Sequence, residues 1–305
     1  MFVRVHEVGP RDGLQNEPEV VSTEDKLAFI QRLVASGHRD VEVTSFVRPR
    51  WIPQLADASE VLARLPRVDG VRYWALVPNQ RGLERALDAG LGHIATFMSV
   101  SETHNQRNVN RTVKESLAGV RQVLGSARAE GLGSRAYLST VFGCPYEGPV
   151  SVSKTVELGL ALLDAGADVL ALGDTTGMGW PALVQEVVAA FGRAGVGPEL
   201  LALHLHDTRG TALANAFAAL ECGIRHLDAS SGGLGGCPYA PGASGNLATE
   251  DLLFLLHAQG YETGIDLDLA VDAAELVERA LGRELSGRYF RQARGAQARR
   301  AARTA

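Results

Sequence analysis

Short apolar runs rich in β-branched residues alternate along this chain with longer stretches whose apolar positions recur every three or four residues. The first pattern is typical of buried strands and the second of amphipathic helices. Eight strands are predicted, at residues 3–8, 41–46, 73–78, 93–100, 135–142, 169–174, 201–206 and 226–230. The helical patterns between them include residues 23–36, 79–89, 111–130, 151–165, 181–194 and 209–221.

The order of these elements predicts a (β/α)8 TIM barrel with additional C-terminal helices. Several helical patterns end at a glycine, and Gly37, Gly90, Gly166 and Gly223 each suit the left-handed residue that ends a helix. Eight strand–helix units over about 260 residues are what such a barrel requires, whereas a doubly wound sheet usually has fewer strands and an early phosphate loop. We expect a catalytic barrel at 1–265 and a helical extension packed on it at 266–305.

The chain has 305 residues, of which 46% are hydrophobic and 21% charged, and its formal net charge is −5. This balance argues against nucleic acid or an anionic membrane as the main partner. The first residues carry charges inside a short apolar run, so neither a signal peptide nor a membrane span is expected. Beyond Gly287 an Arg/Ala-rich run predicts a solvated or frayed end; the alternative is an electrostatic contact with a ligand phosphate.

Polar residues at the carboxyl ends of the predicted strands are candidates for an active site, because TIM-barrel sites lie there. A charged cluster that contains Arg11 and Asp12 follows the first strand. In the second strand, period-two alternation places Glu42 opposite the valines, so it points into the barrel if the valines pack on the helices. A buried carboxylate needs a partner, and Arg11 is the expected one.

The seventh predicted strand carries His204 and His206, which lie on one face because they are two positions apart. Their Cα atoms are expected about 6.5–7 Å apart, close enough to share a cation. Asp12 would add a carboxylate and Asn246 an amide oxygen. This mixture suits Mg²⁺ or Mn²⁺ better than a closed structural Zn²⁺ site. An iron(II) oxygenase triad is the alternative, which the barrel pattern makes less favourable.

A segment rich in glycine and proline, residues 233–246, contains Cys237. Such a loop can close over a substrate while the scaffold stays fixed; the alternative is a turn with an incidental buried cysteine. We predict structural roles for the other two cysteines, Cys144 and Cys222. Three cysteines are odd in number and lack metal-type spacing, which predicts a reducing, cytoplasmic location.

Taken together, these motifs resemble the 3-hydroxy-3-methylglutaryl-CoA lyase family of metal-dependent TIM-barrel enzymes. The resemblance runs from Val8 to about Gly264 and rests on VGPRDGLQNE (8–17), VEVTSF (41–46), VFGCPYEG (141–148), LGDT (172–175), HLHDT (204–208) and the glycine loop. It implies Mg²⁺ or Mn²⁺ bound by Asp12, His204, His206 and Asn246. It also implies catalytic roles for Arg11, Glu42, Asp174 and Cys237, an acyl-CoA thioester as substrate, and a homodimer.

The implied reaction is the retro-Claisen cleavage of 3-hydroxy-3-methylglutaryl-CoA to acetyl-CoA and acetoacetate. Arg11 suits the developing enolate because a guanidinium is planar and does not titrate. Cys237 would give the proton, and Asp174 or a metal-bound group would take the hydroxyl proton. One alternative is the same chemistry on a longer branched 3-hydroxyacyl-CoA, and another is a Claisen-condensing acyltransferase related to 2-isopropylmalate synthase. Arg209, where tyrosine is common in the animal enzymes, leaves the acyl specificity open.

Overall fold

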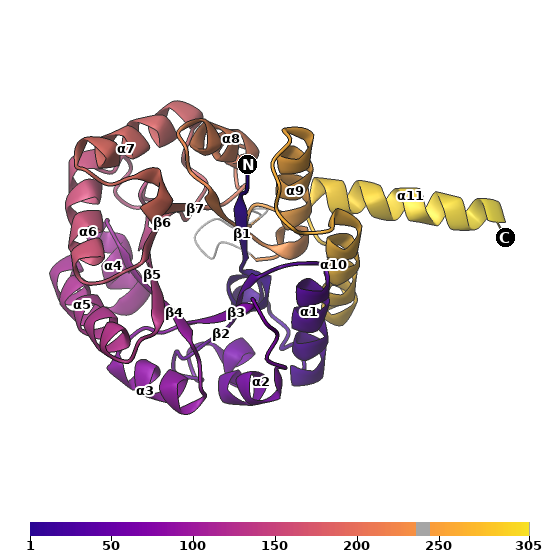
Figure 1. Cartoon of the computed structure of the whole chain (residues 1–305), viewed down its shortest axis with the longest axis horizontal. Helices are drawn as coiled ribbons and strands as arrows, with labels where there is room; N and C mark the ends of the chain where they lie inside the picture. The colour runs from indigo at the N-terminus through magenta and orange to yellow at the C-terminus, as the bar shows by residue number, and fades with distance from the viewer. Residues whose placement is uncertain (236–244, 305) are drawn as a thin grey trace.

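The computed structural model describes residues 1–235 and 245–304, with side chains through residue 296. Eight parallel strands, paired in chain order, close into a barrel surrounded by helices (Figure 1). The strands are β1 Arg4–Glu7, β2 Asp40–Ser45, β3 Arg72–Leu76, β4 His93–Ser99, β5 Gly133–Ser139, β6 Val169–Asp174, β7 Leu201–Leu205 and β8 His226–Ala229. The predicted TIM barrel is confirmed, and β8 pairs with β1 to close it.

The helices that cover the barrel are α1 Thr23–Ala35, α2 Ala58–Arg64, α3 Gln80–Asp88, α4 Glu102–Val109, α5 Val113–Ala129, α6 Val152–Asp164, α7 Pro181–Arg193, α8 Ala212–Glu221 and α9 Thr249–Ala258. The four glycines predicted to end helices all have positive φ, which confirms that prediction. The sequence patterns did not indicate α2, α4 or α9. Helix α4 lacks an apolar stripe, and its ends depend instead on Ser101, which caps the first turn, and on Asn110 in the left-handed conformation.

Two further helices, α10 Leu267–Leu281 and α11 Arg288–Thr304, follow the barrel. Helix α10 packs on α1 and α9. One apolar cluster contains Leu33 of α1, Val271 and Val277 of α10, and Phe290 of α11. Helix α11 starts at this cluster and extends away from the barrel (Figure 1). The backbone of the Arg/Ala-rich run is helical, because alanine and arginine are strong helix formers, and the expectation of a solvated or frayed end stays a prediction. No described helix is long and apolar enough to cross a membrane.

Candidate active site

A cavity of about 560 Å³ opens at the carboxyl ends of the strands. Its inner wall includes Arg11, Asp12, Tyr137, His204 and His206. Its outer part is lined by residues of the β2–α2 connection and of α4 and its surroundings, among them Arg48, Trp51, His104, Asn108 and Arg111. The cavity lining therefore combines buried polar residues with exposed arginines.

A π-helical turn, Gly9–Gly13, presents Arg11 and Asp12 to the cavity. The carbonyl of Val8 accepts hydrogen bonds from the backbone N–H groups of Arg11, Asp12 and Gly13, at 3.1, 2.8 and 3.2 Å. One acceptor thus holds three successive donors directly after β1. Turns of π-helix are rare in proteins and are frequently found at functional sites.

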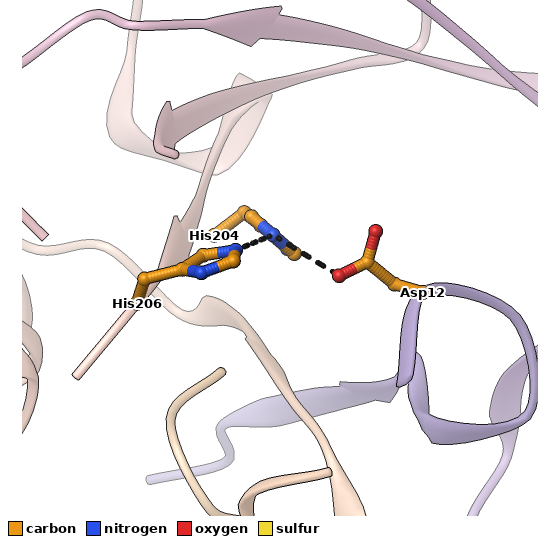
Figure 2. A group of neighbouring side chains, drawn as sticks. All are labelled: Asp12, His204 and His206. Atoms are coloured by element: carbon orange, nitrogen blue, oxygen red, sulfur yellow. Dashed lines mark hydrogen bonds and ion pairs between the residues drawn. The ribbon is translucent and has the colours of Figure 1, made fainter. Parts of the chain in front are cut away.

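Asp12, His204 and His206 point toward one another across the inner cavity (Figure 2). Each offers one ligand atom, and these atoms all lie within 4.8 Å of one another. The two Nε2 atoms of the histidines are 3.3 Å apart, and Oδ2 of Asp12 is 3.9 Å from Nε2 of His204. Three of the four predicted metal ligands are therefore brought together in an arrangement that a divalent cation can occupy.

Asn246, the fourth predicted ligand, lies beside Asp12 because the returning chain is bonded to the end of β7. The backbone N–H of Asp207 donates to the carbonyl of Gly245 at 2.8 Å. The Nδ2 atom of Asn246 donates to Oδ2 of Asp12 at 2.9 Å. Its Oδ1 atom is buried and has no hydrogen-bond partner among the described residues. An amide oxygen left unsatisfied next to a carboxylate is a donor atom that fits a hard cation.

The electrostatics of the cluster favour the metal-binding forms of Asp12 and His206. Burial lowers the pKa of His204, but its hydrogen bond to Asp228 and the charge of Asp12 raise it above the ordinary value. Burial raises the pKa of Asp12, but the charge of Arg11, whose Nη1 donates to Asp12 at 2.6 Å, and the nearby histidines lower it to about 2. Burial and the neighbouring His204 lower the pKa of His206 to about 4. At neutral pH, Asp12 is therefore a carboxylate and His206 a neutral imidazole, the states that metal binding requires.

Glu42 lies fully buried in β2 and accepts a hydrogen bond from Nε of Arg11. The predicted pairing of these two residues is confirmed. The hydroxyl of Tyr137 also donates to Glu42, at 2.7 Å, and the guanidinium carbon of Arg11 lies 5.6 Å from the centre of the Tyr137 ring. Burial raises the pKa of Glu42, but the charge of Arg11 lowers it to about 2. Glu42 is therefore a permanent carboxylate that fixes the orientation of Arg11.

Asp174 ends β6, and its carboxylate is bonded to the loop that follows. Its two oxygens accept the backbone N–H groups of Met178 at 2.7 Å and of Gly179 at 3.0 Å. It is absent from the described residues that line the cavity. Burial raises its pKa to about 6, partly offset by these backbone donors. The contacts show that Asp174 holds the loop after β6, and its predicted role in catalysis stays a prediction.

Three other residues singled out in the sequence have separate outcomes. Arg209 donates to the carbonyls of 176–177, at 2.7 and 3.0 Å, and so braces the same loop as Asp174. Cys144 is buried, and its thiol donates to Oγ of Ser101 at 3.0 Å, in agreement with a structural role. Cys237 lies outside the described residues.

The sequence reasoning missed a polar network that crosses the barrel interior. It contains His6 and Tyr137, which both contact Glu42, and Arg135, whose Nη2 donates to Oδ1 of Asp228 at 2.7 Å. The sequence did contain a signal for this network. Arg135 and Tyr137 are two positions apart in β5, and His226 and Asp228 are two positions apart in β8. Period-two alternation points such side chains to one face of a strand.

A family profile described as HMGL-like matches residues 3–277. This chain belongs to the HMGL-like family. The hydroxymethylglutaryl-CoA lyase of Bacillus subtilis is 50% identical over 286 residues, which are 94% of this chain and 95% of that protein. The cytoplasmic 3-hydroxy-3-methylglutaryl-CoA lyase of Rattus norvegicus is 44% identical over 282 residues, 92% of this chain and 82% of the rat protein. The resemblance found in the motifs is confirmed.

Solved structures of HMG-CoA lyases share the fold of this HMGL-like chain. The crystal structure of the Bacillus subtilis enzyme has a TM-score of 0.94 and 49% identity, with 96% of this chain and 98% of that chain covered. A structure of the enzyme from Acinetobacter baumannii, in complex with coenzyme A and 3-methylmalate, has a TM-score of 0.89 and 39% identity, with 94% and 93% covered.

Proposed function

We propose that this protein is a carbon–carbon lyase that cleaves 3-hydroxy-3-methylglutaryl-CoA to acetyl-CoA and acetoacetate in a divalent-metal-assisted retro-Claisen reaction. The observation that carries the proposal is the convergence of Asp12, His204 and His206 beside Arg11 in one cavity. Membership of the HMGL-like family and the names of the most similar proteins support the same reaction.

Asp12, His204, His206 and Asn246 would hold the cation, and their two imidazole nitrogens and two kinds of oxygen suit Mg²⁺ or Mn²⁺. The buried, unbonded Oδ1 of Asn246 is the feature that best fits such an ion. When bound, the ion supplies positive charge that lowers the pKa of the substrate's 3-hydroxyl and fixes its orientation.

Arg11 would stabilise the negative charge that moves onto the thioester oxygen as the carbon–carbon bond breaks. It lines the cavity, and its guanidinium is held by Glu42 and Asp12 before any substrate arrives. Burial lowers the pKa of Arg11, but the two carboxylates raise it above its ordinary value, so the side chain stays charged. A charged donor fixed in advance needs no reorganisation during the reaction, which is the main source of electrostatic catalysis.

Cys237 would donate the proton that the departing enolate needs. Support comes from the last described residue before it, Gly235, where an added Cβ would lie 2.8 Å from Nδ2 of Asn246 and 3.5 Å from the carbonyl oxygen of Asp12. Gly235, the last described residue before Cys237, thus lies beside two of the proposed metal ligands. Asp174 or a metal-bound group would take the hydroxyl proton, and Asp174 also holds the loop after β6.

The outer cavity would accept the coenzyme A part of an acyl-CoA. Arg48 and Arg111 offer charge to phosphates, and Trp51, which is 61% exposed beneath the guanidinium of Arg48, offers an aromatic face. The complex of the Acinetobacter baumannii enzyme with coenzyme A supports this class of ligand.

We further propose a cytoplasmic homodimer in which residues 266–305 extend the barrel of residues 1–265. The unpaired thiols of Cys144 and Cys222 and the rat relative named as cytoplasmic support the location. The apolar cluster that α10 shares with α1 supports the extension. Light scattering of the purified protein tests the dimer.

A cleavage assay tests the reaction. Protein treated with EDTA is given 3-hydroxy-3-methylglutaryl-CoA, with and without Mg²⁺ or Mn²⁺, and acetyl-CoA and acetoacetate are measured by chromatography. We expect equal amounts of both products, no turnover after chelation, and recovery with either ion. Turnover that persists after chelation contradicts the metal site. A kcat/KM at least tenfold higher for a longer branched 3-hydroxyacyl-CoA would identify that compound as the preferred substrate. Condensation of acetyl-CoA with a 2-oxo acid would favour the acyltransferase.

A further inference from the structure

The two histidines of the cluster differ in the hydrogen-bond partners of their Nδ1 atoms. Nδ1 of His204 is 3.1 Å from Oδ2 of Asp228. Nδ1 of His206 is buried and has no hydrogen-bond partner in the described part of the chain. A histidine that binds a metal through one ring nitrogen usually donates the N–H of the other to an acceptor that fixes the ring. Within residues 1–235 and 245–296, His204 is the one of the two imidazoles that has such a partner.

Asp228 is itself held by a second residue across the barrel. It lies in β8 and is 2% exposed, and its Oδ1 accepts from Nη2 of Arg135 in β5 at 2.7 Å. Arg135 is 4% exposed, and its guanidinium carbon lies 4.8 Å from the ring centre of Tyr137. A carboxylate buried to this extent needs a charged partner to stay ionised. Arg135, Asp228 and His204 therefore form a continuous chain of contacts that ends at the cluster.

We propose that Asp228 is a positioning residue, which accepts the Nδ1–H of His204 and leaves its Nε2 lone pair facing Asp12 and His206. This inference rests on the metal site of the proposed function. The other neutral tautomer would put a proton on Nε2, which lies only 3.3 Å from Nε2 of His206, at the place where the ion has to bind. Arg135 keeps the carboxylate charged and in place.

The competing role for Asp228 is structural, as a buried counter-ion of Arg135 with no effect on the cation. Asp40 provides a matched control. It is also 2% exposed inside the barrel and also pairs with an arginine, since Nε of Arg72 donates to it at 2.6 Å. Trp74 donates to it as well, at 2.9 Å. Among the described residues, Asp40 contacts Arg4, Arg72 and Trp74 but no member of the metal cluster, so Asp40→Asn removes a buried charge pair without touching His204.

The experiment measures the Kd of Mn²⁺ by calorimetry and by electron paramagnetic resonance on chelator-treated full-length protein. We expect Asp228→Asn to weaken Mn²⁺ binding by about 10–100-fold, the usual effect of losing such a partner, and Asp40→Asn to bind within about threefold of wild type. Both variants lose folding stability, so only the affinity separates the two roles. A Kd for Asp228→Asn within about threefold of wild type overturns the proposal.

A second measurement does not depend on whether Asp228→Asn folds. Long-range ¹H–¹⁵N correlations of the histidine rings in Mg²⁺-loaded wild-type protein report the tautomer, with His204 assigned by the loss of its signals in His204→Gln. We expect a proton on Nδ1 of His204, and a proton on Nε2 overturns the proposal. Failure of the wild type to bind Mn²⁺ or Mg²⁺ overturns the metal site as well. Normal binding by both wild type and Asp228→Asn overturns the positioning role alone.

Discussion

Replacing Arg11 by lysine asks whether the site needs a planar cation or only a positive charge. The guanidinium contacts two carboxylates with different nitrogens, Nε with Glu42 and Nη1 with Asp12, the latter at 2.6 Å. Its face lies over Tyr137. A lysine ammonium is a single point of charge on a flexible stem, so it cannot keep both contacts and the stacking. One carboxylate then loses its partner.

The size of the effect follows from the proposed role. Loss of one preorganised donor to a developing oxyanion costs roughly 10²–10³ in kcat, or about 2.7–4 kcal/mol. Glu42 is fully buried but keeps the Tyr137 hydroxyl, so we expect a stability loss of about 1–3 kcal/mol rather than unfolding. Arg11→Lys should therefore lower kcat at least about 100-fold, nearly as much as Arg11→Met, with a smaller change in KM because the contact strengthens in the transition state.

Steady-state cleavage of 3-hydroxy-3-methylglutaryl-CoA at saturating Mg²⁺ gives kcat and KM for each variant, and urea denaturation confirms that each is folded. Arg72→Lys is the matched control, because Arg72 also binds a buried carboxylate in the barrel, that of Asp40, away from the cavity. It should keep kcat near the wild-type value. Recovery of most of the activity in Arg11→Lys would refute the requirement for a guanidinium.

Three further changes test other parts of the account. Cys237→Ala should lower kcat by about 10²–10⁴-fold without shifting the urea midpoint, as expected of a positioned acid; near-normal turnover removes the thiol from the mechanism. In Gly159→Ala, the new Cβ would lie 2.6 Å from two ring atoms of Phe191. Overpacking costs about 1–3 kcal/mol, which should exceed the roughly 0.8–1 kcal/mol gained in helix propensity, so the unfolding free energy should fall. An unchanged unfolding free energy contradicts the overpacking argument. Burial raises the pKa of Glu250 from 4.5 to about 8, so its stabilising protonation is complete below pH 4.5 and lost as the pH rises through 8. In urea titrations, the unfolding free energy of Glu250→Gln minus that of wild type should therefore increase between pH 5 and pH 8. A difference that stays constant over this range contradicts the raised pKa of Glu250.

The barrel was predictable because its signals are local. Alternating periods of two and three to four residues mark strands and helices within windows of a dozen residues, and glycines such as Gly37 mark where helices end. The same alternation correctly placed Glu42 inside and His204 with His206 on one face. Helix α4 escaped because its ends depend on the capping residue Ser101 rather than on an apolar stripe. The ligand pattern was recognisable because its residues sit in short motifs.

What the chain could not reveal by itself is which distant side chains meet inside the closed barrel. Arg135 and Asp228 are 93 positions apart, and their contact exists because barrel closure brings β5 and β8 to face each other across the interior. Asp174 has the residue type and position of a catalytic base, and only the structure shows that backbone N–H groups of the following loop bind its carboxylate. Local periods determine elements and the face of each residue, whereas closure, register and loop hydrogen bonds determine the partner, because those depend on the whole packed structure.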